Sequence, residues 1–227
     1  TDENWKDDAL GAGWAWDDYN SDYMAEKSAM PAYGNLVIFT MKGGFRAVPS
    51  YFQKSLEEAV ANKKGAFRIN RAYGSDLFTV IPSSNTFSST VIPFYTSGNQ
   101  ALLQLLNDTL KNKVESIHYK IDQRPDVSKI YSQPTDSLLK LMMHRSDNFF
   151  AEQTLLMVSN EKLAMMNTAK IIDTLLKSDL QNLPQKPKWV DGSGLSRYNL
   201  FTPQDFVWVL TQMKNEFKIQ NPNFQNP

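Results

Sequence analysis

The sequence predicts an α+β fold in which a β-rich segment is followed by a mainly helical one. Between residues 35 and 95, short apolar or alternating runs are separated by turns that contain glycine or proline, as in the strands of a sheet. From residue 135 onward, apolar residues recur at the three- and four-residue spacing of helices that bury one face. We place a domain boundary at the turn signal Arg124-Pro125-Asp126, which gives domains 1–122 and 123–227.

The first domain is expected to be an assembly of strands with short helices. Strands are predicted over 36–41, 45–48, 66–70, 77–81, 90–95 and 116–121, and helices over 55–62 and 99–110. Pro93 has no backbone N–H, so the strand that contains it fits the edge of a sheet. Residues 1–34 mix acids, aromatics and small residues without periodicity, which is typical of an irregular segment.

The second domain is expected to be mostly helical, with a break inside the run that surrounds Ser146-Asp147-Asn148. On an unbroken helix Ser146 and Asn148 would lie about 200° apart and could not share a target. A helix that ends near His144 and restarts near Asn148 removes this conflict, and Ser, Asp and Asn are residues that cap such a restart. Helices are predicted over 135–144, 148–159 and 162–178, with a last helix opening at Thr202-Pro203.

Composition excludes several classes of function. The 24 Lys and Arg residues balance the 24 Asp and Glu residues, so the chain lacks the excess basic charge that a nucleic-acid partner would need. No apolar run reaches the roughly 18 residues that span a bilayer. Cysteine is absent and the two histidines lie far apart in sequence, which argues against a thiol nucleophile and a zinc site.

Ser-x-Asn alone carries little information, because the pattern occurs three times in the chain. Its surroundings are more specific. Arg145-Ser146-Asp147-Asn148-Phe149-Phe150-Ala151-Glu152 is followed by Trp189-Val190-Asp191-Gly192-Ser193-Gly194-Leu195-Ser196-Arg197, and Trp14-Ala15-Trp16-Asp17-Asp18-Tyr19 precedes both. This combination resembles the D-alanyl-D-alanine carboxypeptidase/endopeptidase family of class C low-molecular-mass penicillin-binding proteins. The resemblance spans most of the chain.

The resemblance implies an acyl-serine mechanism and a β-lactamase/transpeptidase-like fold. The family uses a Ser-x-x-Lys nucleophile and base, a Ser-x-Asn and a Lys-Thr-Gly strand, since a serine hydroxyl needs an adjacent base to become a nucleophile. Only the middle motif is present, with Ser146 and Asn148 as its catalytic residues. Ser137-Leu138-Leu139-Lys140 is a poor substitute for the first, because Ser137 would lie roughly 13 Å from Ser146 along a helix axis. We therefore expect a fragment, with the nucleophile before Thr1 and the Lys-Thr-Gly after Pro227.

The resemblance also implies a pocket for the free amino-acid end of the peptidoglycan stem peptide. The matching positions are Asp18, Tyr23 and Arg197. Their chemistry fits, because a zwitterionic amino-acid centre needs an acid for its ammonium group and a guanidinium for its carboxylate. A structural salt bridge is the competing interpretation of Arg197, and plain packing is that of Tyr23.

The predicted function is therefore part of a cell-envelope, periplasmic D-Ala-D-Ala carboxypeptidase/endopeptidase that acts on stem peptides and, when complete, reacts with β-lactams. No cofactor and no metal is expected. One alternative is a wall-binding homologue without a nucleophile. Another is a β-lactamase-fold esterase or amidase that uses a different acyl donor, against which the pair of Asp18 and Arg197 argues.

Overall fold

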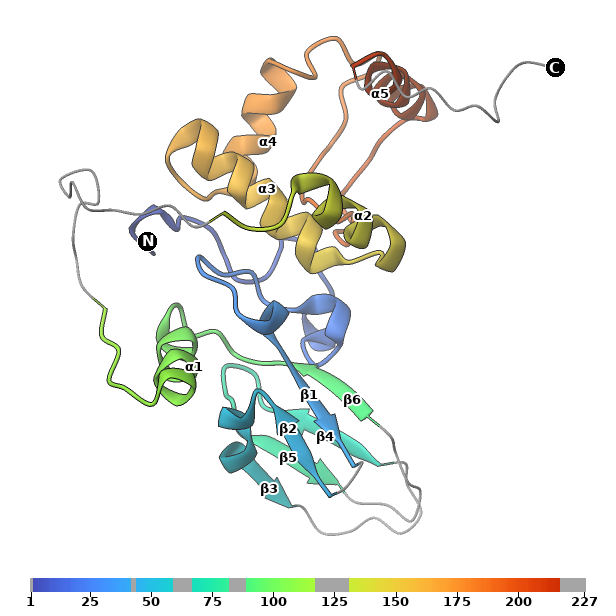
Figure 1. Cartoon of the computed structure of the whole chain (residues 1–227). Helices are drawn as coiled ribbons and strands as arrows, with labels where there is room; N and C mark the ends of the chain where they lie inside the picture. The colour runs from blue at the N-terminus through green and yellow to red at the C-terminus, as the bar shows by residue number, and fades with distance from the viewer. Residues whose placement is uncertain (1, 42–43, 59–66, 82–88, 117–130, 217–227) are drawn as a thin grey trace, which may run out of the picture.

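The computed structural model describes residues 2–41, 44–58, 67–81, 89–116 and 131–216. The described residues form two parts that correspond to the predicted β-rich and helical segments (Figure 1). The two small sheets and one helix lie at the bottom of the view, and four helices lie at the top. The N-terminal segment, drawn in dark blue, runs between the two parts.

The β-rich part contains two three-stranded sheets. The first is antiparallel, with the order β2-β1-β6, and is formed by β1 (Leu36–Thr40), β2 (Arg46–Val48) and β6 (Ser89–Pro93). The second has the order β3-β5-β4 and is formed by β3 (Leu56–Glu58), β4 (Arg68–Arg71) and β5 (Phe78–Ile81), with β3 parallel to β5. Strand β6 lies at the edge of its sheet, as the missing N–H of Pro93 predicted.

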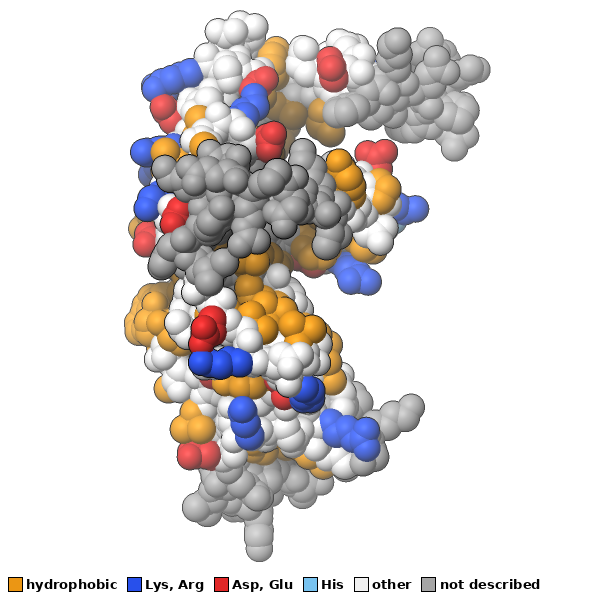
Figure 2. Space-filling view, turned by 60° about the vertical axis from the view of Figure 1, so that its left-hand side comes forward, with side chains coloured by type: hydrophobic (Ala, Val, Ile, Leu, Met, Phe, Trp, Pro, Cys, Tyr) orange, Lys and Arg blue, Asp and Glu red, His pale blue; other side chains and the backbone are white. Residues whose placement is uncertain are grey.

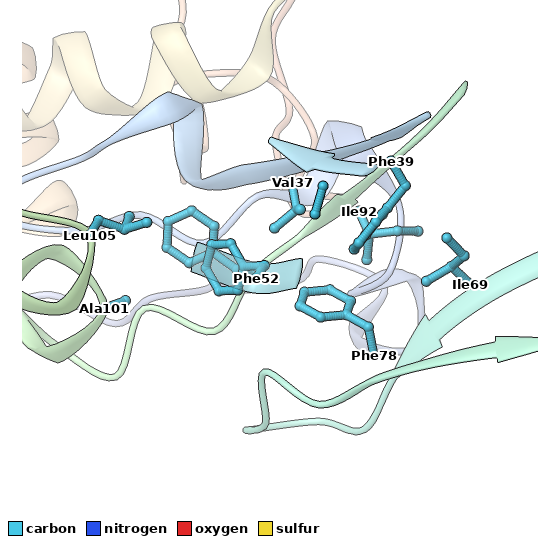
Figure 3. Packing of buried hydrophobic residues seen from close by; sticks show 10 residues of the cluster. Val37, Phe39, Phe52, Ile69, Phe78, Ile92, Ala101 and Leu105 are labelled. Atoms are coloured by element: carbon cyan, nitrogen blue, oxygen red, sulfur yellow. The ribbon is translucent and has the colours of Figure 1, made fainter. Parts of the chain in front are cut away.

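The core of this part lies between the sheets and is rich in phenylalanine. Phe39, Phe52 and Phe78 are fully buried and pack edge to face, with Phe52 between Phe78 and Phe94 (Figure 3). Strand β1 contributes alternate residues to this core, because successive side chains of a strand point to opposite faces. Helix α1 (Gln100–Leu110) covers one end of the core with Leu105.

The helix predicted over 55–62 is wrong. A 3₁₀-helix, η5, occupies Ser50–Ser55, and the chain then enters β3. Leu56 pairs with Phe78 in the parallel register, so hydrogen bonding to β5 overrides the helical spacing of three apolar residues. Residues 59–62 of that prediction lie outside the described residues, and so does nearly all of the strand predicted over 116–121.

The helical part consists of α2 (Thr135–Arg145), α3 (Asn148–Leu163), α4 (Thr168–Lys177) and α5 (Pro203–Glu216). The two helices predicted over 148–159 and 162–178 are present as α3 and α4, but the boundary between them is wrong, because α3 continues to Leu163 and α4 begins only at Thr168. Between them, Met166 exchanges backbone hydrogen bonds with the N-terminal segment, and the Asn167 side chain accepts from Lys170 N at 2.8 Å to cap α4. These contacts with distant residues separate the two helices.

The N-terminal segment contains four short 3₁₀-helices: η1 (Asp2–Asn4), η2 (Trp16–Asp18), η3 (Asp22–Met24) and η4 (Tyr33–Asn35). Two adjacent buried residues tie it to both parts of the protein. Glu26 accepts from Arg71 and from Thr96 of the β-rich part, and Lys27 pairs with Asp7 and donates to Thr168 of α4.

The boundary predicted between residues 122 and 123 lies outside the described residues and stays a prediction.

On the face shown in Figure 2, acidic and basic side chains of the described residues are interspersed.

Asp76 provides a test of the β-rich part's electrostatics. Its carboxylate accepts from Tyr95 N at 2.6 Å, and burial raises the pKa of Asp76 from 3.8 to about 6, against the opposing effects of that bond and of Arg71. A raised carboxyl pKa contributes stability below pH 3.8 that is lost as the pH rises through 6. Asp76→Asn keeps the acceptor and removes the buried charge. We expect it to stabilise the protein by about 1–2 kcal/mol at pH 7 and by little at pH 4.

Denaturant unfolding at pH 4, 5, 6 and 7 measures this difference. Asp179→Asn is the control, since an exposed ion pair with Lys162 lowers the pKa of Asp179 and its removal gives no gain at pH 7. Equal stability changes for Asp76→Asn at all four pH values would contradict the prediction.

Candidate functional site

The Ser-Asp-Asn triplet lies at the break between α2 and α3, and the break predicted there is confirmed. Ser146 ends α2 in the left-handed conformation, with φ 51° and ψ 49°. Asp147 accepts from Phe150 N at 2.9 Å and caps α3, so Asn148 is the first residue of that helix. The left-handed residue turns the chain sharply, which places the side chains of Ser146 and Asn148 on one pocket instead of on opposite faces of a helix.

This pocket has a volume of about 300 Å³ and lies between the helix break and the N-terminal segment. It is lined by Ser146 and Asn148 from one side and by Asp22, Tyr23, Gly34 and Leu36 from the other. The Asn148 amide donates to the Tyr23 carbonyl oxygen at 3.1 Å and so joins the two sides. An amide has a second N–H and a carbonyl oxygen, which are suited to contacts with a ligand.

Asp18 and Tyr23 form one polar unit beside this pocket. The Tyr23 hydroxyl donates to Asp18 Oδ2 at 2.6 Å, and this hydrogen bond raises the pKa of the Tyr23 hydroxyl. Tyr23 is 44% exposed, so a large part of its side chain is accessible to a ligand. Through Tyr23, three of the predicted residues are connected: the hydroxyl contacts Asp18, and the backbone carbonyl contacts Asn148.

Arg197 lies on the loop from Asp191 to Asn199, which we call the glycine-serine loop. Its side chain is exposed and does not line the 300 Å³ pocket. The loop is fixed next to the N-terminal segment: Arg197 N donates to Gly13 O at 3.3 Å, and the Ser196 hydroxyl donates to Ala12 O at 2.7 Å. Arg197 is therefore attached five residues from Asp18, although the two are distant in sequence.

Asp191 organises this loop. Its carboxylate is 1% exposed and accepts four hydrogen bonds, from Trp14 Nε1 (3.0 Å), Ser196 N (2.5 Å), Gly194 N (2.9 Å) and Asn199 Nδ2 (2.7 Å). A buried carboxylate is stable only when such donors replace its water. The first donor belongs to the N-terminal segment, so one side chain sets the loop's conformation and its docking.

A family model for the D-Ala-D-Ala carboxypeptidase 3 (S13) family matches residues 1–226. The chain belongs to this family. Comparison with curated proteins finds no match.

Two solved structures share the fold of this S13 family member. One is penicillin binding protein 4 from Haemophilus influenzae, with a TM-score of 0.67 and 19% identity over 94% of this chain and 52% of that chain. The other is the same protein complexed with a novel β-lactam, with a TM-score of 0.53 and 17% identity over 81% of this chain and 47% of that chain. The chain spans about half the length of these solved proteins.

The structure also reveals residues that support the candidate site and that sequence reasoning missed. Asp191 and Trp14 were part of the quoted motifs, but their direct hydrogen bond joins positions 177 residues apart and has no signal in a single sequence. Gly192 lies against α3, where a Cβ atom would approach Ala151 O to 2.8 Å. Close approach of two backbones explains why glycine is needed at this position.

A larger pocket, of about 500 Å³, lies between the glycine-serine loop and α5. Its apolar lining includes Trp189, Phe201 and Phe206, while the loop contributes Asp191 to Gly194. None of the five predicted site residues lines it, so this pocket is distinct from the candidate site at the helix break.

Within the described residues, no group of three or more His, Cys, Asp or Glu side chains is placed to hold a metal ion. No helix of the described part is long and apolar enough to cross a membrane.

Gly192→Ala tests the docking of the glycine-serine loop. The added methyl group meets backbone atoms of Ala151 and Glu152, which cannot move without shifting α3, so we expect a loss of about 1–3 kcal/mol of stability. Gly194→Ala is the comparison, because that position has open space but φ +82°, and we expect about 1 kcal/mol there from backbone strain alone. Thermal and denaturant unfolding measure both. A loss at Gly192 no larger than that at Gly194 would show that the loop does not depend on this contact.

Proposed function

We propose that this S13 family chain is the substrate-recognising portion of a D-alanyl-D-alanine carboxypeptidase/endopeptidase that cleaves peptidoglycan stem peptides through an acyl-serine intermediate. The observation that carries the proposal is the 300 Å³ pocket, where Ser146 and Asn148 meet Tyr23, which in turn is bonded to Asp18. These residues come from two segments separated by more than a hundred positions. Family membership over residues 1–226 supports the same conclusion.

In this proposal Ser146 and Asn148 assist acyl transfer. The exposed hydroxyl of Ser146 relays a proton between the nucleophilic serine's base and the leaving amine, as a positioned hydroxyl can when it both donates and accepts. The Asn148 amide uses its second N–H to orient the acyl group. Its bond to the Tyr23 carbonyl holds the amide in one rotamer, which lowers the entropy lost when substrate binds.

Asp18, Tyr23 and Arg197 form the recognition part. Asp18 binds the ammonium group of the stem peptide's free amino-acid end, Arg197 binds its carboxylate, and Tyr23 packs along the methylene groups. The Tyr23 hydroxyl already orients the Asp18 carboxylate, so little reorganisation is needed on binding. The exposed guanidinium of Arg197 can form the paired hydrogen bonds that carboxylates favour.

The proposed setting is the periplasm or cell envelope, where peptidoglycan is the partner, and β-lactams are expected to acylate the same nucleophile. The chemistry needs no metal or organic cofactor, because lysine and serine side chains carry the proton transfers.

Ser146→Ala tests the catalytic assignment. Because a proton relay is lost, we expect acylation by penicillin in the natural protein that contains this chain to slow by roughly 10²–10⁴-fold, with little change in melting temperature. Stopped-flow or gel-based acylation kinetics measure it. Ser178→Ala is the control, since Ser178 also ends a helix but lies away from the pocket. A lower melting temperature without a separate kinetic defect would mark Ser146 as a structural cap.

Asp18→Asn and Arg197→Gln test the recognition pair. Each removes one charge-assisted hydrogen bond. The transition-state stabilisation calculated from kcat/KM for free stem peptides should therefore decrease by about 1.5–3 kcal/mol. Acylation by a penicillin without an amino-acid side chain should hardly change. Asp17→Asn is the matched control beside Asp18. Equal losses on both substrates would make the two residues structural. A selective loss in Arg145→Gln instead would move the carboxylate site to that pocket-lining arginine.

A further inference from the structure

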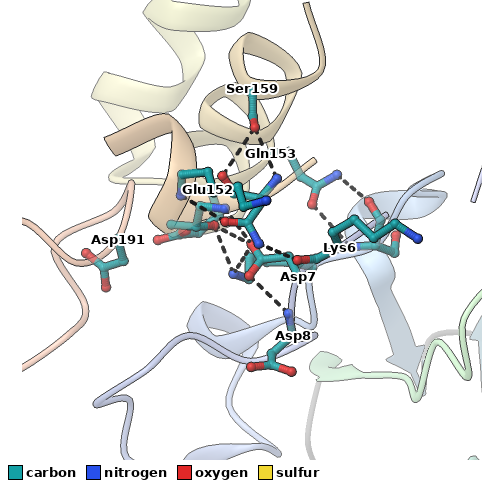
Figure 4. Close-up of polar contacts among 12 residues, drawn as sticks. Lys6, Asp7, Asp8, Glu152, Gln153, Ser159 and Asp191 are labelled. Carbon is teal, nitrogen blue, oxygen red and sulfur yellow. Dashed lines mark hydrogen bonds and ion pairs between the residues drawn. The ribbon is translucent and has the colours of Figure 1, made fainter. Parts of the chain in front are cut away.

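Glu152 is a fully buried acid on α3 that none of the roles above uses. It lies one helical turn after Asn148 and is 0% exposed. Its Oε1 atom accepts from Ser193 N of the glycine-serine loop at 2.8 Å. Its Oε2 atom has no hydrogen-bond partner among the described residues. Figure 4 shows this carboxyl group in the polar layer between α3, the N-terminal segment and the loop.

The carboxyl group of Glu152 is costly to bury. Burial raises its pKa, the nearby Asp191 raises it further, and Ser193 and Lys27 lower it only in part. Lys27 gives limited help because its ammonium group is already paired with Asp7 at 2.9 Å. An apolar side chain of similar size would avoid this cost. What such a side chain lacks is the acceptor for Ser193 N.

Through that acceptor, α3 contacts both segments that carry the proposed recognition residues: the N-terminal segment with Tyr23 and the glycine-serine loop with Arg197. The first turn of α3 holds Asn148, which donates to the Tyr23 carbonyl oxygen at 3.1 Å. The second turn holds Glu152, which binds the loop that carries Arg197. Because both residues lie on one continuous α-helix and are one turn apart, the two contacts place the loop relative to Ser-Asp-Asn at the helix start.

We propose that Glu152 is a positioning residue that places Arg197 for the carboxylate of the substrate's amino-acid end. It acts by holding the glycine-serine loop against α3, and it takes no part in acyl transfer. Glu152 is thus a determinant of specificity. The assignment of a substrate to Arg197 rests on the proposed function, but the positioning of the loop does not.

Gln153 offers a matched control. It is the next residue of α3, it is also buried, and it makes two hydrogen bonds to the backbone of Ser28, at 3.2 and 2.9 Å. Those bonds join α3 to the N-terminal segment and not to the loop. Glu152→Met and Gln153→Met therefore remove buried polar groups from adjacent positions of one helix. Glu152→Gln keeps an acceptor for Ser193 N and serves as the conservative rescue.

The first experiment measures amide hydrogen exchange by NMR in this chain. In Glu152→Met we expect exchange at Ser193 and Arg197 to accelerate by about 10-fold relative to Gln153→Met, as for loss of one buried hydrogen bond. Glu152→Gln should restore at least most of the protection. Equal exchange at these two amides in both Met variants overturns the positioning role, whatever the substrate proves to be.

The second experiment measures kinetics in the natural protein that contains this chain. Glu152→Met should raise KM for stem peptides about 10-fold, the effect of one misplaced charge-assisted bond, and leave penicillin acylation within about twofold. Gln153→Met should change neither selectively. If Arg197→Gln is selective but Glu152→Met matches Gln153→Met, the inference fails and the proposed function stands. If Arg197→Gln is not selective, the proposed function fails, and the exchange experiment still decides the role of Glu152.

Discussion

The structure around the site depends on the buried carboxylate of Asp191. Four donors converge on it, three from its own loop and one from Trp14 in the N-terminal segment. Without these donors the carboxylate oxygens would be buried at 1% exposure with no hydrogen-bond partner, and without the carboxylate two backbone N–H groups of the loop would lose their acceptor. The requirement is mutual, so the loop and the N-terminal segment adopt their conformations together. The position of Arg197 follows from that coupling.

The same N-terminal segment is connected to the β-rich part and to the helical part by two buried charged side chains. Glu26 and Lys27 are neighbours in the chain, but the first is satisfied by Arg71 and Thr96 and the second by Asp7 and Thr168. Buried ion pairs add little net stability, but leaving one partner unpaired is expensive. A shift of the sheets relative to the helices would leave one of these charges buried without its partner. The pairs therefore contribute more to the specificity of the arrangement than to its net stability.

The candidate site itself is built from the ends of elements. Ser146 ends one helix, Asn148 begins the next, and Asp18 and Tyr23 belong to single 3₁₀ turns. At the ends of helices some backbone N–H and C=O groups have no partner within the helix, so they can bind a ligand together with the neighbouring side chains. Rigidity then has to come from contacts made behind the site, and α3 supplies them through its buried face. This division separates the groups that are proposed to touch a substrate from those that hold them in place.

Local chemistry in the sequence determined the α+β class, five of the six observed strands, the capped break at Ser146–Asn148 and the opening of α5 at Pro203. Each depends on residues close in sequence, such as the Asp147 cap or the alternation in β1. Tertiary structure decided what local spacing could not. Pairing with β5 made Leu56–Glu58 a strand, and contacts of Met166 with the N-terminal segment placed the break between α3 and α4 later in the chain than the apolar spacing predicted.

The site divides in the same way. Family motifs indicated Ser146, Asn148, Asp18, Tyr23 and Arg197, but the assignment of roles to them stays a prediction. The bond between Trp14 and Asp191, and the buried acceptor at Glu152, join positions far apart in the chain. Their energies depend on desolvation, which exists only after folding has removed the surrounding water. A single sequence contains the residues that make these contacts, and only the folded chain decides which of them meet.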